Sequence, residues 1–203
     1  MSIATPHLGV SNYTYIEQTI GMTLPFGLKQ LVSNFMLRSG KHVFLTDGYD
    51  DQQQQLPLLY QMATEDIYLD PLRAFTKRRL YANLRNDFVV PCEISSLLSY
   101  DECKILRRKN QSQSGIVELI NEGDRKITGR NIKMMESDTF NRMLNSLDNI
   151  GWSKVLVNFP GYVPNAHNKI CALQREPQWF YDKVMGTEQG KVVMNHAADW
   201  LLS

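Results

Sequence analysis

Short apolar runs separated by polar turns predict the strands of this chain. Met1–Thr5 has the pattern of the carboxyl end of a strand, and Pro6 stops it. Arg78–Leu84 is a second run that favours a strand. Val155–Phe159 is a third, apolar enough to be buried on both faces of a parallel sheet. These runs, with helical segments between them, predict an α/β protein.

Apolar residues at helical spacing predict helices between these strands. One pattern runs from Phe26 to Leu37, and Gly40 follows it as a stop signal. Lys41–Thr46 is short and rich in β-branched and aromatic residues, so a strand and an extended loop both remain open. The other segments that we predict to be helical are Pro57–Ala63, Leu69–Thr76, Asp138–Leu147 and Gly190–Leu202, the last with Val192, Val193, His196, Ala197, Trp200 and Leu201 along one side.

Residues 100–150 mix polar stretches with short apolar runs, and we interpret them as an insertion that includes a candidate strand at Ile116–Ile120. A chain of 203 residues is long enough for one domain with a substantial core. We therefore predict that residues 1–203 belong to one domain. Gly48–Gln55 is polar and low in complexity, which predicts a surface loop.

The charge balance excludes one broad class of function. Lys and Arg number 22 and Asp and Glu number 21, so the formal charge is +1, whereas nucleic-acid binders need a concentrated basic face. Cys92, Cys103 and Cys171 form no Cys-x-x-Cys pair, which argues against a zinc or redox motif and favours a reducing compartment. No apolar stretch approaches the ~18 residues of a membrane span, and no signal peptide is visible. We expect an intracellular protein, cytoplasmic or peripherally associated with a membrane.

Two polar residues follow predicted strands, where the catalytic groups of α/β enzymes lie. Asp87 comes where the β-rich run of segment 79–91 ends, in a turn that closes on Pro91, and His167 lies in a loop after Val155–Phe159. An acid after one strand and a histidine after the next is the order of the last two members of a Ser…Asp…His triad. Structural alternatives stay open, because Asp87 also fits an ordinary Asn-Asp turn and His167 a loop histidine bonded to a carbonyl.

The remaining histidines and the serines are weaker candidates. His196 lies inside the last predicted helix, where we expect a packed side chain. His7 favours a structural hydrogen bond, and His42 has no suggestive context. The sequence contains no Gly-x-Ser-x-Gly, the strained elbow that exposes a nucleophilic serine, so no nucleophile is predicted within it.

A set of short motifs spans residues 4–91 and continues from Trp152 to the end of the sequence. The motifs are Ala4-Thr5-Pro6-His7-Leu8-Gly9, Ser39-Gly40-Lys41-His42-Val43-Phe44-Leu45-Thr46-Asp47, Pro57-Leu58-Leu59 with Met62, Leu72-Arg73-Ala74-Phe75 with Arg78-Arg79-Leu80-Tyr81-Ala82-Asn83, Asn86-Asp87 with Val90-Pro91, and Ala166-His167-Asn168. Together they resemble the eukaryotic serine esterase and lipase family of the α/β-hydrolase fold.

The resemblance implies an ester hydrolase that acts on lipids through a Ser–His–Asp triad, without a metal or other cofactor. Carried over onto this sequence, Asp87 is the triad acid and His167 the base. The family's serine lies in an upstream Gly-His-Ser-Leu-Gly-type elbow, which this sequence does not contain. The implied fold is a partial α/β hydrolase, in which Met1–Thr5, Arg78–Leu84 and Val155–Phe159 are the last three parallel strands and helices flank them.

The implied partners are a lipid ester substrate and a membrane or lipid-droplet surface. The edge of such a partial sheet would be open to self-association, because unpaired strand edges pair with other chains. A second hypothesis comes from another class: a catalytically inactive lipase-like fragment that binds a lipid or a protein. The presence of Asp87 and His167 favours the hydrolase, since a binding module needs neither.

Overall fold

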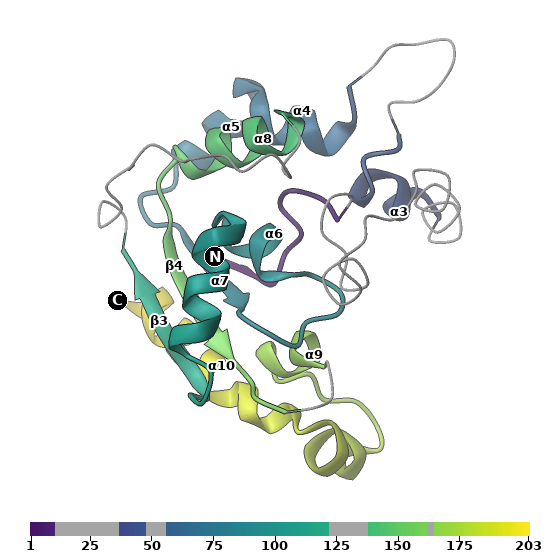
Figure 1. Ribbon diagram of the computed structural model, residues 1–203, viewed down its shortest axis with the longest axis vertical. Helices are drawn as coiled ribbons and strands as arrows, with labels where there is room; N and C mark the ends of the chain where they lie inside the picture. Colours follow the sequence, from purple (N-terminus) through teal and green to yellow (C-terminus); the bar gives the residue numbers. More distant parts are fainter. Residues whose placement is uncertain (11–36, 48–55, 122–137, 162–164) are drawn as a thin grey trace.

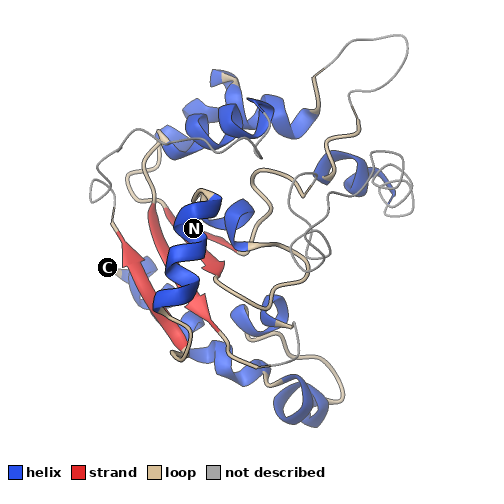
Figure 2. Ribbon diagram, in the orientation of Figure 1, coloured by secondary structure: helices blue, strands red, loops and turns tan. Residues whose placement is uncertain are grey.

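The computed structural model describes residues 1–10, 37–47, 56–121, 138–161 and 165–203, which form a mixed α/β structure around a four-stranded sheet (Figures 1 and 2). The strands are β1 (Ser2–Ile3), β2 (Arg79–Asn83), β3 (Gly115–Ile120) and β4 (Ser153–Asn158). Their order in the sheet is β1–β2–β4–β3. The first three neighbours are parallel, and β3 is antiparallel to β4. The predicted α/β class and the three neighbouring parallel strands are confirmed, with strand ends that differ by one or two residues.

Some helices cover the sheet, and others form a group beyond the amino ends of β2 and β4 (Figure 1). Their bounds are α3 Leu37–Val43, α4 Leu58–Thr64, α5 Asp66–Arg73, α6 Cys92–Ser96, α7 Tyr100–Lys109, α8 Asp138–Asp148, α9 Ala166–Ile170, the π-helix η1 Phe180–Met185, the 3-10 helix η2 Thr187–Gly190, and α10 Lys191–Leu202. The separate group consists of α4, α5 and α8, which pack on one another through a core that includes Leu69, Phe140 and Leu144. Along the part of the chain that the structure describes, no helix is both long and apolar enough to cross a membrane.

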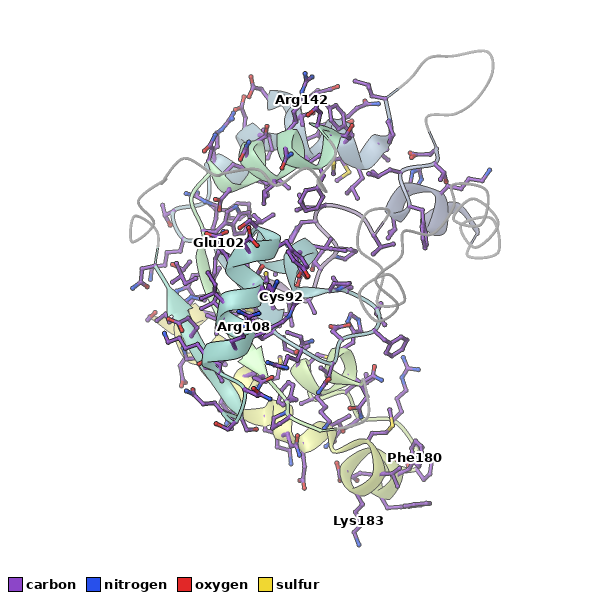
Figure 3. The ribbon with its side chains drawn as sticks, viewed as in Figure 1. Cys92, Glu102, Arg108, Arg142, Phe180 and Lys183 are labelled. Carbon is purple, nitrogen blue, oxygen red and sulfur yellow. The ribbon has the colours of Figure 1, made fainter. Side chains whose placement is uncertain are left out.

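Both faces of the central strands are buried, because their side chains alternate between two apolar layers. Tyr81 and Val155 belong to a layer that includes residues of α9 and α10. Ala82 and Leu156 belong to the opposite layer, which includes Cys92 of α6, labelled in Figure 3, and a residue of α7. The sheet therefore lies between two helical layers, with α7 in front of it and α10 behind it in Figure 1.

Several predicted helices are confirmed with shifted ends. Pro57 immediately precedes α4 as its N-cap residue, and α8 runs one residue past the predicted end at Leu147. The prediction of Leu69–Thr76 is placed too late, since α5 spans Asp66–Arg73. At the end of α5 the Arg78 guanidinium donates to the Leu72 and Arg73 carbonyls, which supplies a partner for acceptors that have none within the helix.

The prediction that Gly40 stops a helix is wrong, as are both alternatives for Lys41–Thr46. α3 includes Gly40 and continues to Val43. After the helix, the Phe44 amide still donates to the Gly40 carbonyl at 2.9 Å, and the Phe44 side chain is buried in the core. Burial of a large aromatic side chain offsets the roughly 1 kcal/mol that glycine costs inside a helix. The predicted helix Phe26–Leu37 and loop Gly48–Gln55 lie almost entirely outside the described residues.

The region interpreted as an insertion contains an element that the pattern did not predict. This is α7, which begins with a capping box: the Ser99 hydroxyl accepts from the Glu102 amide, and the Glu102 carboxylate accepts from the Ser99 amide at 2.7 Å. A Ser-x-x-Glu signal was therefore present in the sequence. The candidate strand Ile116–Ile120 is β3, with one more residue at its start.

The apolar side predicted for the last helix is narrower than expected. Of that set, Val193 and Ala197 are buried in α10, whereas Val192 and Leu201 are 59% and 61% exposed. The helix rests on the sheet through one stripe, and Val192 and Leu201 lie outside it.

Candidate active site

Asp87 lies four residues beyond the last residue of β2, in a turn that is tied to the end of β4. Asn86 adopts a left-handed backbone conformation (φ 59°), which asparagine tolerates better than most residues. Its Nδ2 donates to the carbonyls of Phe159 at 2.9 Å and Gly161 at 3.1 Å. These hydrogen bonds place Asp87 at the carboxyl edge of the sheet, beside the chain that leaves β4.

The Asp87 carboxylate is buried and held by the main chain of its own turn. Its Oδ1 accepts from the Val89 amide at 3.0 Å and from the Val90 amide at 2.8 Å, and 1% of the side chain is exposed. These donors compensate the charge for lost hydration. The Asn-Asp turn that the sequence offered as an alternative is therefore present, and the same turn orients the carboxylate.

His167 is the second residue of α9, whereas the sequence analysis placed it in a loop. The segment before it is fixed to the Asp87 turn, since Asn165 forms a β-bridge with Asp87 and the Ala166 amide donates to the Asn86 carbonyl at 2.9 Å. Ala166 itself is buried in the layer of α10. His167 therefore lies on a short helix whose start is fixed to the Asp87 turn.

The structure brings the two predicted residues together. His167 Nδ1 lies 3.2 Å from Asp87 Oδ2, although the residues are 80 positions apart. The Asp87 hydrogen bond raises the pKa of His167, partial burial opposes this rise, and the Asp87 charge adds to it. A carboxylate on Nδ1 favours the tautomer with the proton on that nitrogen, which leaves Nε2 free to accept a proton. The imidazole is 31% exposed, so a reacting group can approach it.

Asn83 is a member of this site that the sequence analysis missed. It ends β2, it is 1% exposed, and its Nδ2 donates to Asp87 Oδ2 at 2.7 Å. The available signal was a polar residue at the carboxyl end of a buried strand, four positions before a candidate acid. Buried polar groups of this kind are usually hydrogen-bonded to a specific partner.

His196 and His42 each have a partner elsewhere in the fold. His196 Nδ1 lies 2.9 Å from the Tyr81 hydroxyl and the two rings meet edge to face, as expected of a packed side chain. His42 Nδ1 lies 2.6 Å from Asp47 Oδ2, a context that the sequence did not suggest. The same Asp47 oxygen accepts from the Leu58 amide at 3.0 Å, so Asp47 links the end of α3 to the start of α4.

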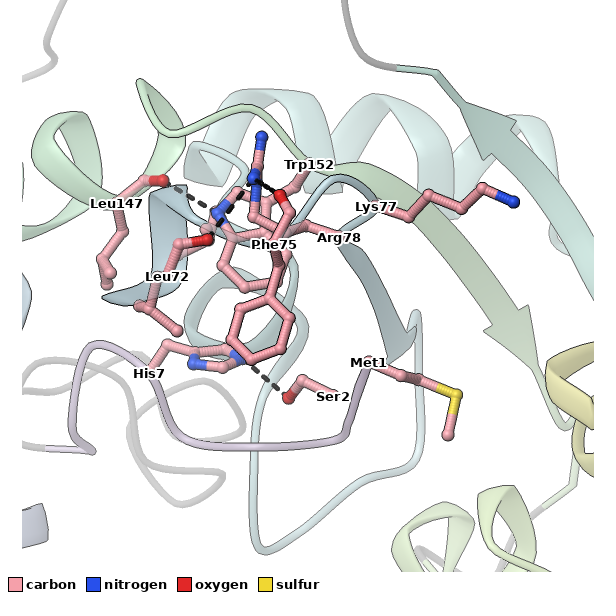
Figure 4. Close-up of a pocket in the computed structure, with 10 residues that line it drawn as sticks. Met1, Ser2, His7, Leu72, Phe75, Lys77, Arg78, Leu147 and Trp152 are labelled. Atoms are coloured by element: carbon pink, nitrogen blue, oxygen red, sulfur yellow. Dashed lines mark hydrogen bonds between the residues drawn. The ribbon is translucent and has the colours of Figure 1, made fainter. Parts of the chain in front are cut away.

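His7 borders a cavity of about 300 Å³ at the opposite end of the sheet (Figure 4). The cavity is lined at the amino ends of β1, β2 and β4 by residues that include Ser2, Arg78 and Trp152. His7 Nε2 makes the expected structural hydrogen bond, 2.9 Å from the Ser2 hydroxyl, and burial lowers the pKa of His7 to about 4. This imidazole lies far from the carboxyl edge and does not join the Asp87–His167 pair.

Among the described residues, no group of three or more His, Cys, Asp or Glu side chains is arranged to hold a metal ion.

Comparisons with known proteins identify the family of this chain. The model of the family described as "Putative serine esterase (DUF676)" matches residues 1–105, which include Asn83 and Asp87. A Saccharomyces cerevisiae protein named "Putative lipase YDL109C" is 34% identical over 109 residues, which cover 53% of this chain and 15% of that relative. This chain thus spans a small part of the length of that relative. No solved structure matches significantly.

The family model covers more than half of the 203 residues and includes the strand and turn that carry Asp87. This chain belongs to the putative serine esterase family.

Proposed function

We propose that this chain supplies the acid and the base of a serine hydrolase that cleaves lipid esters. In this proposal Asp87 is the acid and His167 the base, and β1, β2 and β4 are the last three strands of an α/β-hydrolase sheet. The support is the order of the elements: an acid after β2 and a histidine after β4, the next parallel strand of the sheet, as in the Ser…Asp…His arrangement.

The observation that carries the proposal is the contact between Asp87 Oδ2 and His167 Nδ1 at 3.2 Å. The acid is 1% exposed and the base 31% exposed, a burial difference that suits a fixed carboxylate behind an accessible imidazole. A catalytic histidine needs its rear nitrogen held by such a carboxylate, because the imidazolium that forms during the reaction must be stabilised.

The proposed reaction is acyl transfer. His167 Nε2 accepts the serine proton while the serine oxygen bonds to the ester carbonyl carbon, and Asp87 stabilises the resulting imidazolium. The imidazolium then gives its proton to the leaving alkoxide as the ester C–O bond breaks. Water, deprotonated by His167, attacks the acyl-enzyme and releases the acid, after which the serine recovers its proton.

The serine in this scheme comes from outside the given sequence, because the sequence contains no Gly-x-Ser-x-Gly. The proposed substrate class follows from the printed name of the yeast relative, a lipase. A lipid surface as the place of action, and pairing of the outer edge of β1 with another strand, belong to the same proposal. A chain without the serine would be a lipid- or protein-binding fragment.

Fluorophosphonate labelling of the natural protein that contains this sequence tests the proposal. We expect a serine outside the 203 residues to be labelled, as located by peptide mapping. His167→Gln should slow labelling and ester hydrolysis by about 10⁴-fold, since the triad acts as a unit. His196→Gln is the matched control, because His196 binds Tyr81 and does not contact Asp87 in the described structure.

Each outcome of the labelling supports or contradicts the hydrolase proposal. Label on a serine within residues 1–203 would mean that the nucleophile was misassigned. Absence of label on folded natural protein would contradict the hydrolase proposal and leave the binding fragment. Equal loss in the His167 and His196 variants would show that His167 has no special role. Hydrolysis of acylglycerols, phospholipids and short water-soluble esters, measured side by side, then identifies the ester class.

A further inference from the structure

The Asp87 oxygen that faces His167 is shared with a second donor. Asp87 Oδ2 lies 2.7 Å from Asn83 Nδ2 and 3.2 Å from His167 Nδ1. Hydrogen bonds to a carboxylate are typically about 2.7–2.9 Å long, so the Asn83 bond has the length of a strong bond and the His167 bond does not. The tighter of the two interactions at this oxygen is therefore the one from Asn83.

The orientation of the Asn83 amide supports this ranking. Asn83 is 1% exposed, and its Oδ1 has no hydrogen-bond partner among the described residues. The opposite orientation would direct the amide oxygen at the Asp87 carboxylate, which repels it. Since an unpartnered buried oxygen is costly, the charge of Asp87 decides how the amide lies.

The other carboxylate oxygen keeps Asp87 in place without Asn83. Oδ1 accepts from two main-chain amides of the turn, those of Val89 and Val90. Main-chain donors fixed in a turn do not depend on the Asn83 side chain. Loss of Asn83 should thus leave the carboxylate near His167 while it removes the donor that competes for Oδ2.

We propose that Asn83 acts through Asp87 and limits the strength of the hydrogen bond that Oδ2 makes with His167. This inference rests on the proposed function for its catalytic meaning. Two donors on one oxygen divide its charge, so each bond is weaker than it would be alone. The consequence for the enzyme is an imidazole that releases its proton at a lower pH than an uncontested Asp87 would allow.

Other ionisable groups near α9 have partners of their own. On α9 itself, the Lys169 ammonium donates to the Gln189 side chain. Just beyond the helix, the Cys171 thiol contacts the main-chain carbonyl of His167. On the packed elements, Glu188 of η2 pairs with Lys191 of α10 at the surface. Asp87 is the charged side chain that hydrogen-bonds to the His167 ring.

An NMR titration of the His167 imidazole in this chain tests the inference without any catalytic readout. Asn83→Leu removes the donor and keeps water from replacing it, and we expect the His167 titration midpoint to rise by about half a pH unit. The Nδ1 proton resonance, observed below the midpoint, should move downfield as the bond to Asp87 strengthens. Asn83→Ser, which keeps a hydroxyl donor, should restore most of the wild-type midpoint.

Asn158→Leu is the matched control. Asn158 is the corresponding buried asparagine at the end of β4, and its Nδ2 donates to the carbonyls of Asn110 and Gln113. It should destabilise the chain similarly and leave the His167 midpoint unchanged. If Asn83→Leu does not fold, Asn83→Ser and Asn83→Ala decide the question. The His167 midpoint should then be higher in Asn83→Ala than in Asn83→Ser.

The possible results separate this inference from the proposed function. An unchanged midpoint in the Asn83 variants, with a wild-type midpoint that Asp87→Asn lowers, overturns the role of Asn83 alone. A lowered midpoint or an upfield shift also overturns it, since Asn83 would then be required to bring Oδ2 to His167. A wild-type midpoint that Asp87→Asn does not lower would mean that the Asp87–His167 bond does not form in solution, which counts against the proposed function itself.

Discussion

The ion pair between Arg107 and Glu93 joins three elements next to the candidate site. Arg107 Nη1 and Nη2 donate to the two Glu93 oxygens at 2.6 and 2.9 Å, and Arg107 Nε donates to the Leu84 carbonyl at 2.9 Å. The pair therefore ties α7 to α6 and to the end of β2. Burial alone would lower the pKa of Arg107, but the charge and hydrogen bonds of Glu93 raise it above its usual value.

Removing either partner takes the opposite charge away from the other. The Glu93 side chain is 0% exposed and that of Arg107 is 20% exposed. Loss of one partner from a buried pair costs about 3–5 kcal/mol. We expect Arg107→Ala to lower the free energy of unfolding by about 3–4 kcal/mol, because a fully buried carboxylate loses its ion pair. Glu93→Gln should cost less, about 2 kcal/mol, since water reaches part of Arg107 and the amide oxygen still accepts a hydrogen bond.

Urea unfolding of the chain at neutral pH, followed by far-ultraviolet circular dichroism, measures these losses. Arg108→Ala is the matched control: Arg108 is exposed, lies next along α7 and is labelled in Figure 3, and its loss should be within about 0.5 kcal/mol of zero. The double variant Glu93→Gln/Arg107→Met should lose less than the sum of the single variants, because neither charge is stranded. A loss for Arg107→Ala no larger than for Arg108→Ala would refute the reasoning.

Three further changes have defined outcomes. Asp87→Asn removes the interaction that raises the pKa of His167. A raised pKa contributes stability that is present below the unfolded value of about 6.5 and is lost as the pH rises through the folded value. The difference in stability from wild type, measured in urea, should therefore shrink between about pH 6 and pH 8. A difference that grows over that range would contradict the sign. Ser99→Ala removes the cap of α7 and should cost about 1 kcal/mol in thermal unfolding, and an unchanged midpoint would argue against the capping box. Leu144→Ala deletes a fully buried side chain of α8 and should cost about 2–5 kcal/mol in urea, whereas a loss below about 1 kcal/mol would show that α8 is not packed on α4.

The sequence by itself determined the parallel strands, the helix α8 and the order in which Asp87 and His167 follow their strands. These features rest on local pattern, because apolar runs and helical spacing report which face of an element is buried. The family motifs are of the same kind, since they are short strings at the ends of strands. The Asn-Asp turn could be predicted from the sequence for the same reason.

Only the tertiary structure decided which polar groups meet. Asn83 joins Asp87 because β2 and its turn fold back on one carboxylate, and His167 reaches it because the start of α9 bonds to Asn86. Packing also overrode a local signal. Because burial of Phe44 stabilises α3, this helix continues past Gly40. Strand and helix propensities act over a few residues. The Asp87 oxygen that Asn83 and His167 share depends instead on a contact between Asp87 and His167, which are 80 positions apart, and no local pattern records it.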